Sequence, residues 1–118
     1  MRRAVLALVA LVLVAGIFSP VPPPDPFHGS DKVGHALGFL ALALCARAVW
    51  SGPSPAWLWA GLLLAGPVLE WLQHWVSPAR QRSLDDALAN MAGVLLAMAL
   101  CWAWSRWHAW RRAEPPPA

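Results

Sequence analysis

Charged residues are scarce in this sequence. Asp, Glu, Lys and Arg together make up 13% of the 118 residues, whereas 58% of the residues are hydrophobic. Such a composition is typical of membrane proteins and argues against an ordinary soluble domain. Because one membrane-spanning helix needs about 20 mainly apolar residues, four spans with short connections would use nearly the whole chain. The sequence therefore predicts a single membrane domain with no separate soluble domain.

Cysteine is also rare, and charge is missing from the centres of the apolar runs. The two cysteines, Cys45 and Cys101, both lie inside such runs, where thiols usually pack as small hydrophobic side chains. We therefore expect no disulfide. Neither a charge at mid-membrane depth nor an inverted repeat is visible, so a transporter or channel is less favoured than the functions considered below.

Four apolar runs remain, separated by proline clusters at 20–26, 53–55 and 115–117 that indicate turns. They predict an all-α, polytopic bundle with spans at about 4–20, 33–50, 56–75 and 87–105. The first run could be a signal peptide, but it leads into a proline-rich turn without a clear cleavage site, which favours an uncleaved helix. The second run is short, and a re-entrant helix is its alternative.

The distribution of basic residues predicts the orientation. The ends that share a side with the N-terminus hold Arg2, Arg3, Arg47, Arg106, Arg111 and Arg112, against Lys32, Arg80 and Arg82 on the other side. Because basic residues favour cytoplasmic loops, we expect a multi-pass protein of the bacterial inner (plasma) membrane. Both termini, including the tail 106–118, would be cytoplasmic. Topology thus accounts for the net charge of +3 without nucleic-acid binding.

Polar residues gather at the opposite, extracytoplasmic ends of the spans. Five of the six carboxylates (Asp25, Asp31, Glu70, Asp85 and Asp86) and three of the four histidines (His28, His35 and His74) fall there. Separate segments would thereby deliver polar groups to one place. We predict a common polar site at this end of the bundle.

Helical spacing aligns these groups within each segment. Asp31 and His35 are four residues apart, as are Asp86 and Asn90, and Glu70 is one turn from Gln73. Asn90 lies inside a span and needs a hydrogen-bond partner there. A carboxylate such as Glu70 is costly at this depth unless paired, and Arg80, Arg82, Lys32 and His35 are its available partners.

Two kinds of local signal concern helix ends and helix packing. Ser30 or Asp31 is a candidate N-cap for the second helix, and Ser83 is a candidate cap for the fourth. Small residues four apart, which let helix backbones approach closely, occur on the second helix at Gly34 and Gly38, and on the fourth at Ala89, Gly93 and Ala97. We interpret these stripes as packing surfaces.

Taken in order, the polar motifs resemble the pattern of VanZ-like membrane proteins. The matching residues are Asp31 and Lys32 with His35 and Phe39, Glu70 with Gln73, Pro78 with Arg80, and Asp86 with Asn90 and Gly93. The resemblance spans residues 31–93 and departs from the family pattern at His74, Trp75 and Arg82. It implies a small polytopic protein with an outward-facing polar site, of a family associated with glycopeptide (teicoplanin) resistance, and it implies no established reaction.

Two functions fit these residues. The first is binding of an anionic lipid-linked or glycan-related ligand of the cell envelope, because lysine and arginine attract phosphate oxygens. The predicted ligand-binding residues are Asp31, Lys32, His35, Glu70, Gln73, Arg80, Asp86 and Asn90. The alternative is a membrane enzyme acting on a lipid-linked substrate by general acid-base catalysis, with Glu70 or His35 as the base and Asp86 as a further catalytic candidate.

Metal binding is a third hypothesis. His35, His74, Asp31, Glu70 and Asp86 are suitable ligand types for zinc or manganese. They come from different segments, however, and no ligand spacing supports a site. The sequence by itself therefore predicts no metal and no cofactor, and it leaves the oligomeric state open.

Overall fold

The computed structural model describes residues 1–19, 26–50, 52–53, 56–76 and 83–113. These residues form four helices and no strand: α1 (Arg2–Ile17), α2 (Ser30–Val49), α3 (Ala56–Val76) and α4 (Leu84–Ala113). The all-α prediction is confirmed, and each predicted apolar run corresponds to one helix. Three residues of the predicted polar end, Asp25, Arg80 and Arg82, lie outside the described residues.

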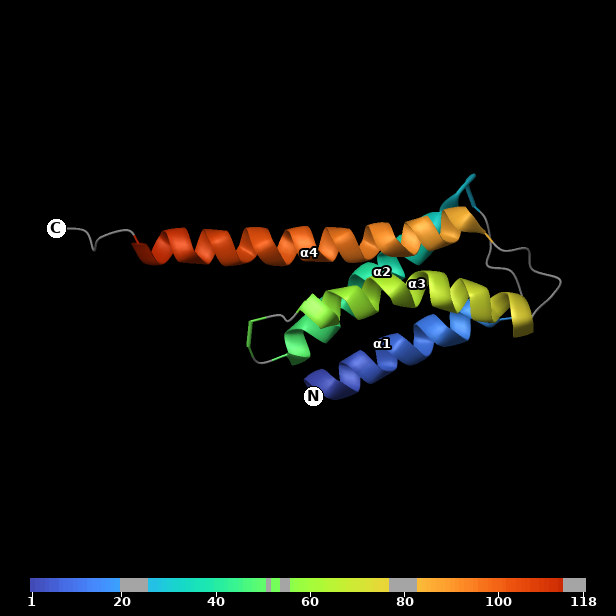
Figure 1. Ribbon diagram of the computed structural model, residues 1–118, viewed down its shortest axis with the longest axis horizontal. Helices are drawn as coiled ribbons and strands as arrows, with labels where there is room; N and C mark the ends of the chain where they lie inside the picture. Colours follow the sequence, from blue (N-terminus) through green and yellow to red (C-terminus); the bar gives the residue numbers. More distant parts are fainter. Residues whose placement is uncertain (20–25, 51, 54–55, 77–82, 114–118) are drawn as a thin grey trace.

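Successive helices run in opposite directions (Figure 1). The C-terminal ends of α1 and α3 therefore lie at the same end of the bundle as the N-terminal ends of α2 and α4. The central helix is α2, which packs against α1 and most extensively against α4, while α3 packs mainly against α4. The second half of α4 continues to Ala113, beyond the predicted end at residue 105, and projects past the other helices (Figure 1).

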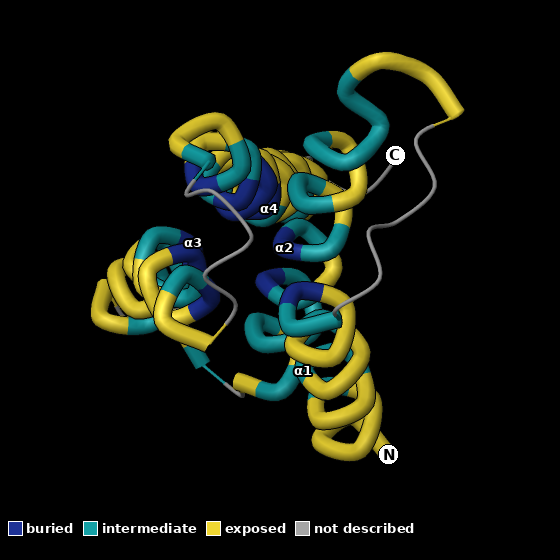
Figure 2. Tube along the Cα trace, turned by 90° about the vertical axis from the view of Figure 1, so that its right-hand side faces the viewer, coloured by how far each residue is buried: buried dark blue, intermediate teal, exposed yellow. Residues whose placement is uncertain are grey.

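The helices bury narrow stripes and leave most apolar side chains on the outside. The buried hydrophobic residues are Ile17, Phe39, Ala43, Ala87, Val94 and Ala97. Figure 2 shows the buried positions on the faces that the helices turn toward one another, with exposed positions on the outer faces. Large exposed side chains there include Leu11, Leu64 and Leu95. Extended apolar surface of this kind marks contact with a membrane or a protein partner.

Among the described segments, two helices are long and apolar enough to cross a membrane, α2 and α4. With 16 residues, α1 is shorter than the usual span of about 20. The third helix, α3, is long enough, but Glu70, Gln73 and His74 make its C-terminal end polar.

The backbones of α2 and α4 touch at Gly93. A Cβ atom at this position would lie 2.1 Å from the carbonyl oxygen of Ala36 and 2.9 Å from the amide nitrogen of Leu40. The packing role predicted for Gly93 is therefore observed. The matching prediction for Gly34 is wrong, because no atom of another described segment lies within 4 Å of the place its Cβ would occupy, and Gly38 faces Leu13 of α1 instead of α4.

Arginines mark the end of the bundle at which α1 begins and α2 ends. Arg2 Nη1 donates a hydrogen bond to the carbonyl oxygen of Ala48 at 3.4 Å, and Arg47 Nη1 donates to that of Trp50 at 3.1 Å. The rings of Trp50 and Trp57 meet edge to face, 4.9 Å apart. This end therefore combines basic and aromatic side chains, as membrane interfaces do.

Candidate functional site

The first turn of α2 positions one wall of the site. Gly29 precedes the helix with a φ of +86°, a left-handed conformation that glycine adopts without steric cost. The prediction that Ser30 or Asp31 caps this helix is therefore wrong, since the helix already includes both residues. Asp31 and Lys32 consequently lie in the first turn, and His35 lies one turn further into the bundle.

The first turn of α4 positions the opposite wall. The amide N–H of Asp86 donates to Ser83 Oγ at 3.1 Å, so the capping role predicted for Ser83 is observed. This hydrogen bond satisfies one of the free amides at the start of the helix. It also fixes the turn from which the Asp86 side chain reaches α2.

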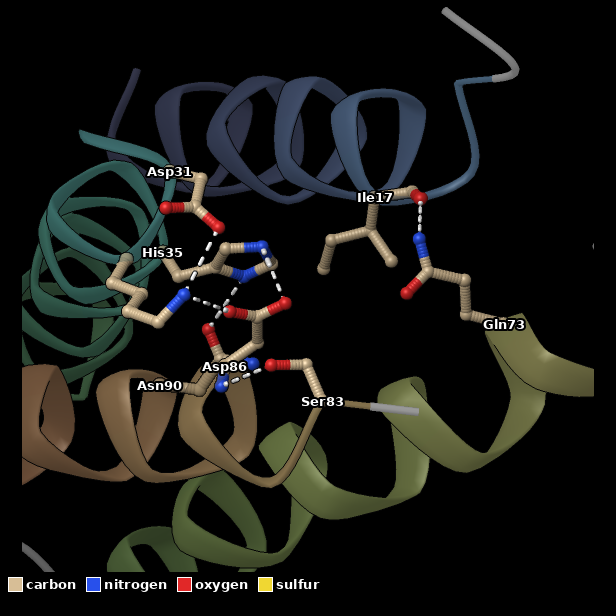
Figure 3. Close-up of polar contacts among 8 residues, drawn as sticks. Ile17, Asp31, His35, Gln73, Ser83, Asp86 and Asn90 are labelled. Atoms are coloured by element: carbon tan, nitrogen blue, oxygen red, sulfur yellow. Dashed lines mark hydrogen bonds and ion pairs between the residues drawn. The ribbon is translucent and has the colours of Figure 1, made fainter. Parts of the chain in front are cut away.

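His35 joins these two walls (Figure 3). Its Nδ1 lies 3.0 Å from Asn90 Oδ1, and its Nε2 lies 4.0 Å from Asp86 Oδ2. Because an amide oxygen can only accept a hydrogen bond, Nδ1 is the donor in this contact. In the neutral ring, the lone pair is then on Nε2, on the side of Asp86. His35 is therefore the partner of the Asn90 side-chain oxygen inside the bundle.

The third helix contributes Glu70, which is 6% exposed. Ligand atoms of His35, Glu70 and Asp86 all lie within 4.8 Å of one another. Three helices thus bring three titratable side chains into one small space. We call these residues, together with Asp31, Lys32 and Asn90, the polar cluster.

Exposure decreases from the rim of the polar cluster to its interior. The Lys32 side chain is 41% exposed, that of Asp86 is 17% exposed, and Asn90 is completely buried. Lys32 Nζ contacts Asp31 Oδ2 at 3.3 Å and Asp86 Oδ1 at 3.7 Å. A positive charge therefore lies at the accessible edge, and the more deeply buried charged groups are carboxyls.

Gln73 does not join the polar cluster, although the sequence predicts it as a ligand-binding residue. Its Nε2 donates a hydrogen bond to the backbone carbonyl of Ile17 at the end of α1. Figure 3 shows this side chain directed at α1 and away from His35 and Asp86. Gln73 therefore fastens α1 to α3, a role that no spacing within α3 could have indicated.

The predicted site is thus brought together in part. Asp31, Lys32, His35, Glu70, Asp86 and Asn90 lie in one cluster, Gln73 faces α1, and Arg80 is outside the described residues. The shared helix face of Asp31 and His35 does not produce a pair, since Asp31 contacts Lys32 while His35 contacts Asn90 and Asp86. Chemically, the cluster offers a cation at its rim, a histidine near a carboxylate, and a group of three metal-ligand types.

No protein-family model, curated protein or solved structure matches this chain. The geometry of the polar cluster and its position in the bundle are therefore the basis for assigning a function.

Proposed function

We propose that this chain is a small multi-pass protein of the bacterial inner membrane whose polar cluster binds an anionic, lipid-linked or glycan-related ligand of the cell envelope. The observation that carries the proposal is the convergence of Lys32, His35, Glu70, Asp86 and Asn90, from three helices, at one end of the bundle. Polar side chains placed inside an otherwise apolar bundle are costly and are commonly functional.

A four-span arrangement is supported by the way polar and apolar groups are distributed. The polar residues of α3, Glu70 and Gln73, are buried against other helices, whereas Leu64 and Val68 on the same helix are exposed. This inside-out pattern suits a helix surrounded by lipid. The short α1 would complete the bundle through its contact with α2.

The arginines support an extracytoplasmic position for the polar cluster. Arg2 and Arg47 lie at the opposite end of the bundle, toward which Arg111 and Arg112 at the end of α4 also extend. Basic residues favour the cytoplasmic side, so both termini would be cytoplasmic and the cluster would face outward.

The chemistry of the cluster favours a ligand that carries both negative charge and hydroxyl groups. Lys32 is half-exposed at the rim and suits a phosphate oxygen, and Arg80 would add a second cation. Carboxylates and Asn90 suit the hydroxyl groups of a glycan. The resemblance to VanZ-like proteins supports the same proposal, because motif residues from three separate segments lie together. A link to glycopeptide resistance would follow from membership of that family.

Native mass spectrometry of the full-length protein, gently extracted in detergent, would test the proposal. The wild type is compared with Lys32→Met, Arg80→Met and the control Arg112→Met, which removes a charge at the opposite end. We expect a phosphorylated lipid to co-purify with the wild type and the control and to be lost from the other two variants. Equal lipid occupancy in all four proteins, or none in the wild type, would contradict the proposal.

A second candidate function is general acid-base catalysis on the same class of ligand. It is favoured by the contact of Asn90 with His35 Nδ1, which leaves His35 Nε2 facing Asp86 beside the buried Glu70. Proton transfer by such a group contributes about 10²–10⁴-fold to rate. Purified protein incubated with a polyprenyl diphosphate sugar should then release product, and Glu70→Gln should lower turnover by about this factor while lipid occupancy is retained. Absence of product with the wild type would exclude this candidate.

A further inference from the structure

The polar cluster contains a group of three side chains with the spacing of an ion site. The ligand atoms of His35, Glu70 and Asp86 lie within 4.8 Å of one another. Zinc binds nitrogen and oxygen ligands at about 2.0–2.2 Å in tetrahedral geometry, so two ligand atoms of one ion lie about 3.3–3.6 Å apart. Side-chain shifts of up to about 1.5 Å would therefore close the three groups around one ion.

Asn90 provides a second, independent observation. It is completely buried, its Oδ1 holds His35 Nδ1 at 3.0 Å, and Nε2 of the same ring then faces Asp86 Oδ2 at 4.0 Å. Metal-binding histidines characteristically donate their other ring N–H to an oxygen acceptor, which fixes the ring and its tautomer. Asn90 Nδ2, in turn, is buried with no hydrogen-bond partner within the described part of the chain. Packing alone does not explain a buried amide that is only half satisfied.

Charge balance is the third argument. Glu70 and Asp86 are two carboxyl groups drawn together in partly or fully buried positions, which is unfavourable for like charges. Lys32 Nζ lies 3.7 Å from Asp86 Oδ1 and 3.3 Å from Asp31 Oδ2, and its side chain is 41% exposed. A divalent cation between the three ligand atoms would offset the repulsion between the two carboxylates.

From these observations we infer that His35, Glu70 and Asp86 form an open site for one divalent transition-metal ion, with Asn90 as a positioning residue. One imidazole and two carboxylates suit zinc or manganese, and three protein ligands leave a coordination position open. This inference replaces the sequence-based expectation that no metal binds. The open position could also take an oxygen of the anionic ligand, and this further role rests on the proposed function. Metal binding itself does not depend on that function.

Metal titration of the full-length protein in detergent tests the inference. The protein is stripped with a chelator, freed of it, and titrated with Zn²⁺, Mn²⁺ and, for comparison, Mg²⁺, by calorimetry and by elemental analysis of the gel-filtered protein. We expect one Zn²⁺ or Mn²⁺ per chain, loss of this binding in His35→Ala and Glu70→Gln, and about 10–100-fold weaker binding in Asn90→Ala. Thermal unfolding without metal shows whether each variant is folded. If His35→Ala does not fold, the nearly isosteric Glu70→Gln tests the loss of metal binding in its place.

His108→Ala is the matched control. This histidine lies in the projecting part of α4, where its ring packs against Trp104 and Trp107. We expect unchanged metal affinity in this variant. Absence of stoichiometric binding in the wild type, or equal weakening by His108→Ala and His35→Ala, would overturn the inference.

Lys32→Met separates the metal site from the proposed ligand-binding function. Removing the cation beside Asp86 should tighten metal binding severalfold, because the metal no longer competes with Lys32. The same variant should lose the anionic lipid. In the wild type, metal binding without lipid binding would refute the proposed function and keep the metal site, whereas lipid binding without metal binding would do the reverse. Weaker metal binding in Lys32→Met would count against the metal site.

Discussion

One helical turn separates a polar layer of the bundle from an apolar layer. His35 is followed by Phe39 on α2, and Asn90 is followed by Val94 on α4. Phe39, Val94 and Asn90 are all completely buried. Asn90 is thus as deeply buried as the apolar side chains of the next layer, but an apolar side chain needs only a complementary shape, whereas a polar one also needs hydrogen-bond partners. The polar layer therefore depends more on the relative positions of the helices.

The contact of α2 with α4 holds both layers, and Gly93→Ala should disturb it most. The added Cβ would lie 2.1 Å from a backbone oxygen of α2, and backbone atoms cannot move aside without separating the helices. We expect a loss of about 3 kcal/mol or more, seen as failure to assemble or a strongly lowered midpoint of thermal unfolding in detergent.

Gly34→Ala is the control for this prediction, since among the described segments its added Cβ would meet no atom of another element within 4 Å. Alanine is favoured over glycine in a helix by roughly 0.5–1 kcal/mol, so stability should be unchanged or slightly higher. Similar destabilisation by both substitutions would show that α2 and α4 do not pack as described.

Paired substitutions distinguish the two layers directly. Phe39→Ala leaves a cavity and should cost about 3 kcal/mol or more, whereas Asn90→Ala, which deprives His35 of its partner, should cost about 1–3 kcal/mol. The effects on ligand and metal binding should have the opposite order. When the folded protein of each variant is isolated, Asn90→Ala should show the larger loss of binding and Phe39→Ala the smaller. Equal binding losses in the two variants would mean that the polar layer has no separate function.

The cap of α4 links stability to the geometry of the polar layer. Ser83→Ala removes the oxygen that accepts the N–H of Asp86 and should cost about 1 kcal/mol, as is usual for an N-cap. Thermal unfolding measures this cost, and Ser83→Asp should restore most of it. If Ser83→Ala changes neither the thermal stability nor the ligand and metal binding that involve Asp86, a water molecule replaces the cap.

The smallest effect is expected in the projecting part of α4. The guanidinium of Arg111 lies 4.2 Å from the ring centroid of Trp107, an exposed contact worth up to about 1 kcal/mol. Arg111→Gln should therefore change the unfolding midpoint little and leave ligand and metal binding unchanged. A clear loss of binding in this variant would mean that the functional site extends to the other end of the molecule.

Much of the architecture could be predicted because it depends on periodicity and composition. The four apolar runs predict four helices, and the position of each polar group along its run predicts the end at which His35, Glu70 and Asp86 meet. Helix limits were less predictable. The start of α2 depends on the left-handed Gly29, and α4 continues past residue 105 through a segment with more charge, where apolar content no longer marks the helix.

Rotation of each helix about its axis could not be read from spacing. Asp31 and His35 share a helix face, yet His35 contacts Asn90, which is 55 residues away. Gly34 and Gly93 each belong to a stripe of small residues four apart, yet of the two only Gly93 closely approaches the backbone of another described helix. Gln73 lies one turn from Glu70, but the packing of α1 directs it to Ile17.

The sequence by itself therefore determined the number of helices, their alternating directions and the end of the bundle that carries the polar side chains, because these follow from the length and order of the apolar runs. Only the tertiary structure decided which polar side chains meet. Each helix has several faces that could be turned inward, and the choice among them depends on contacts such as Gly93 with Ala36, which join residues far apart in the chain.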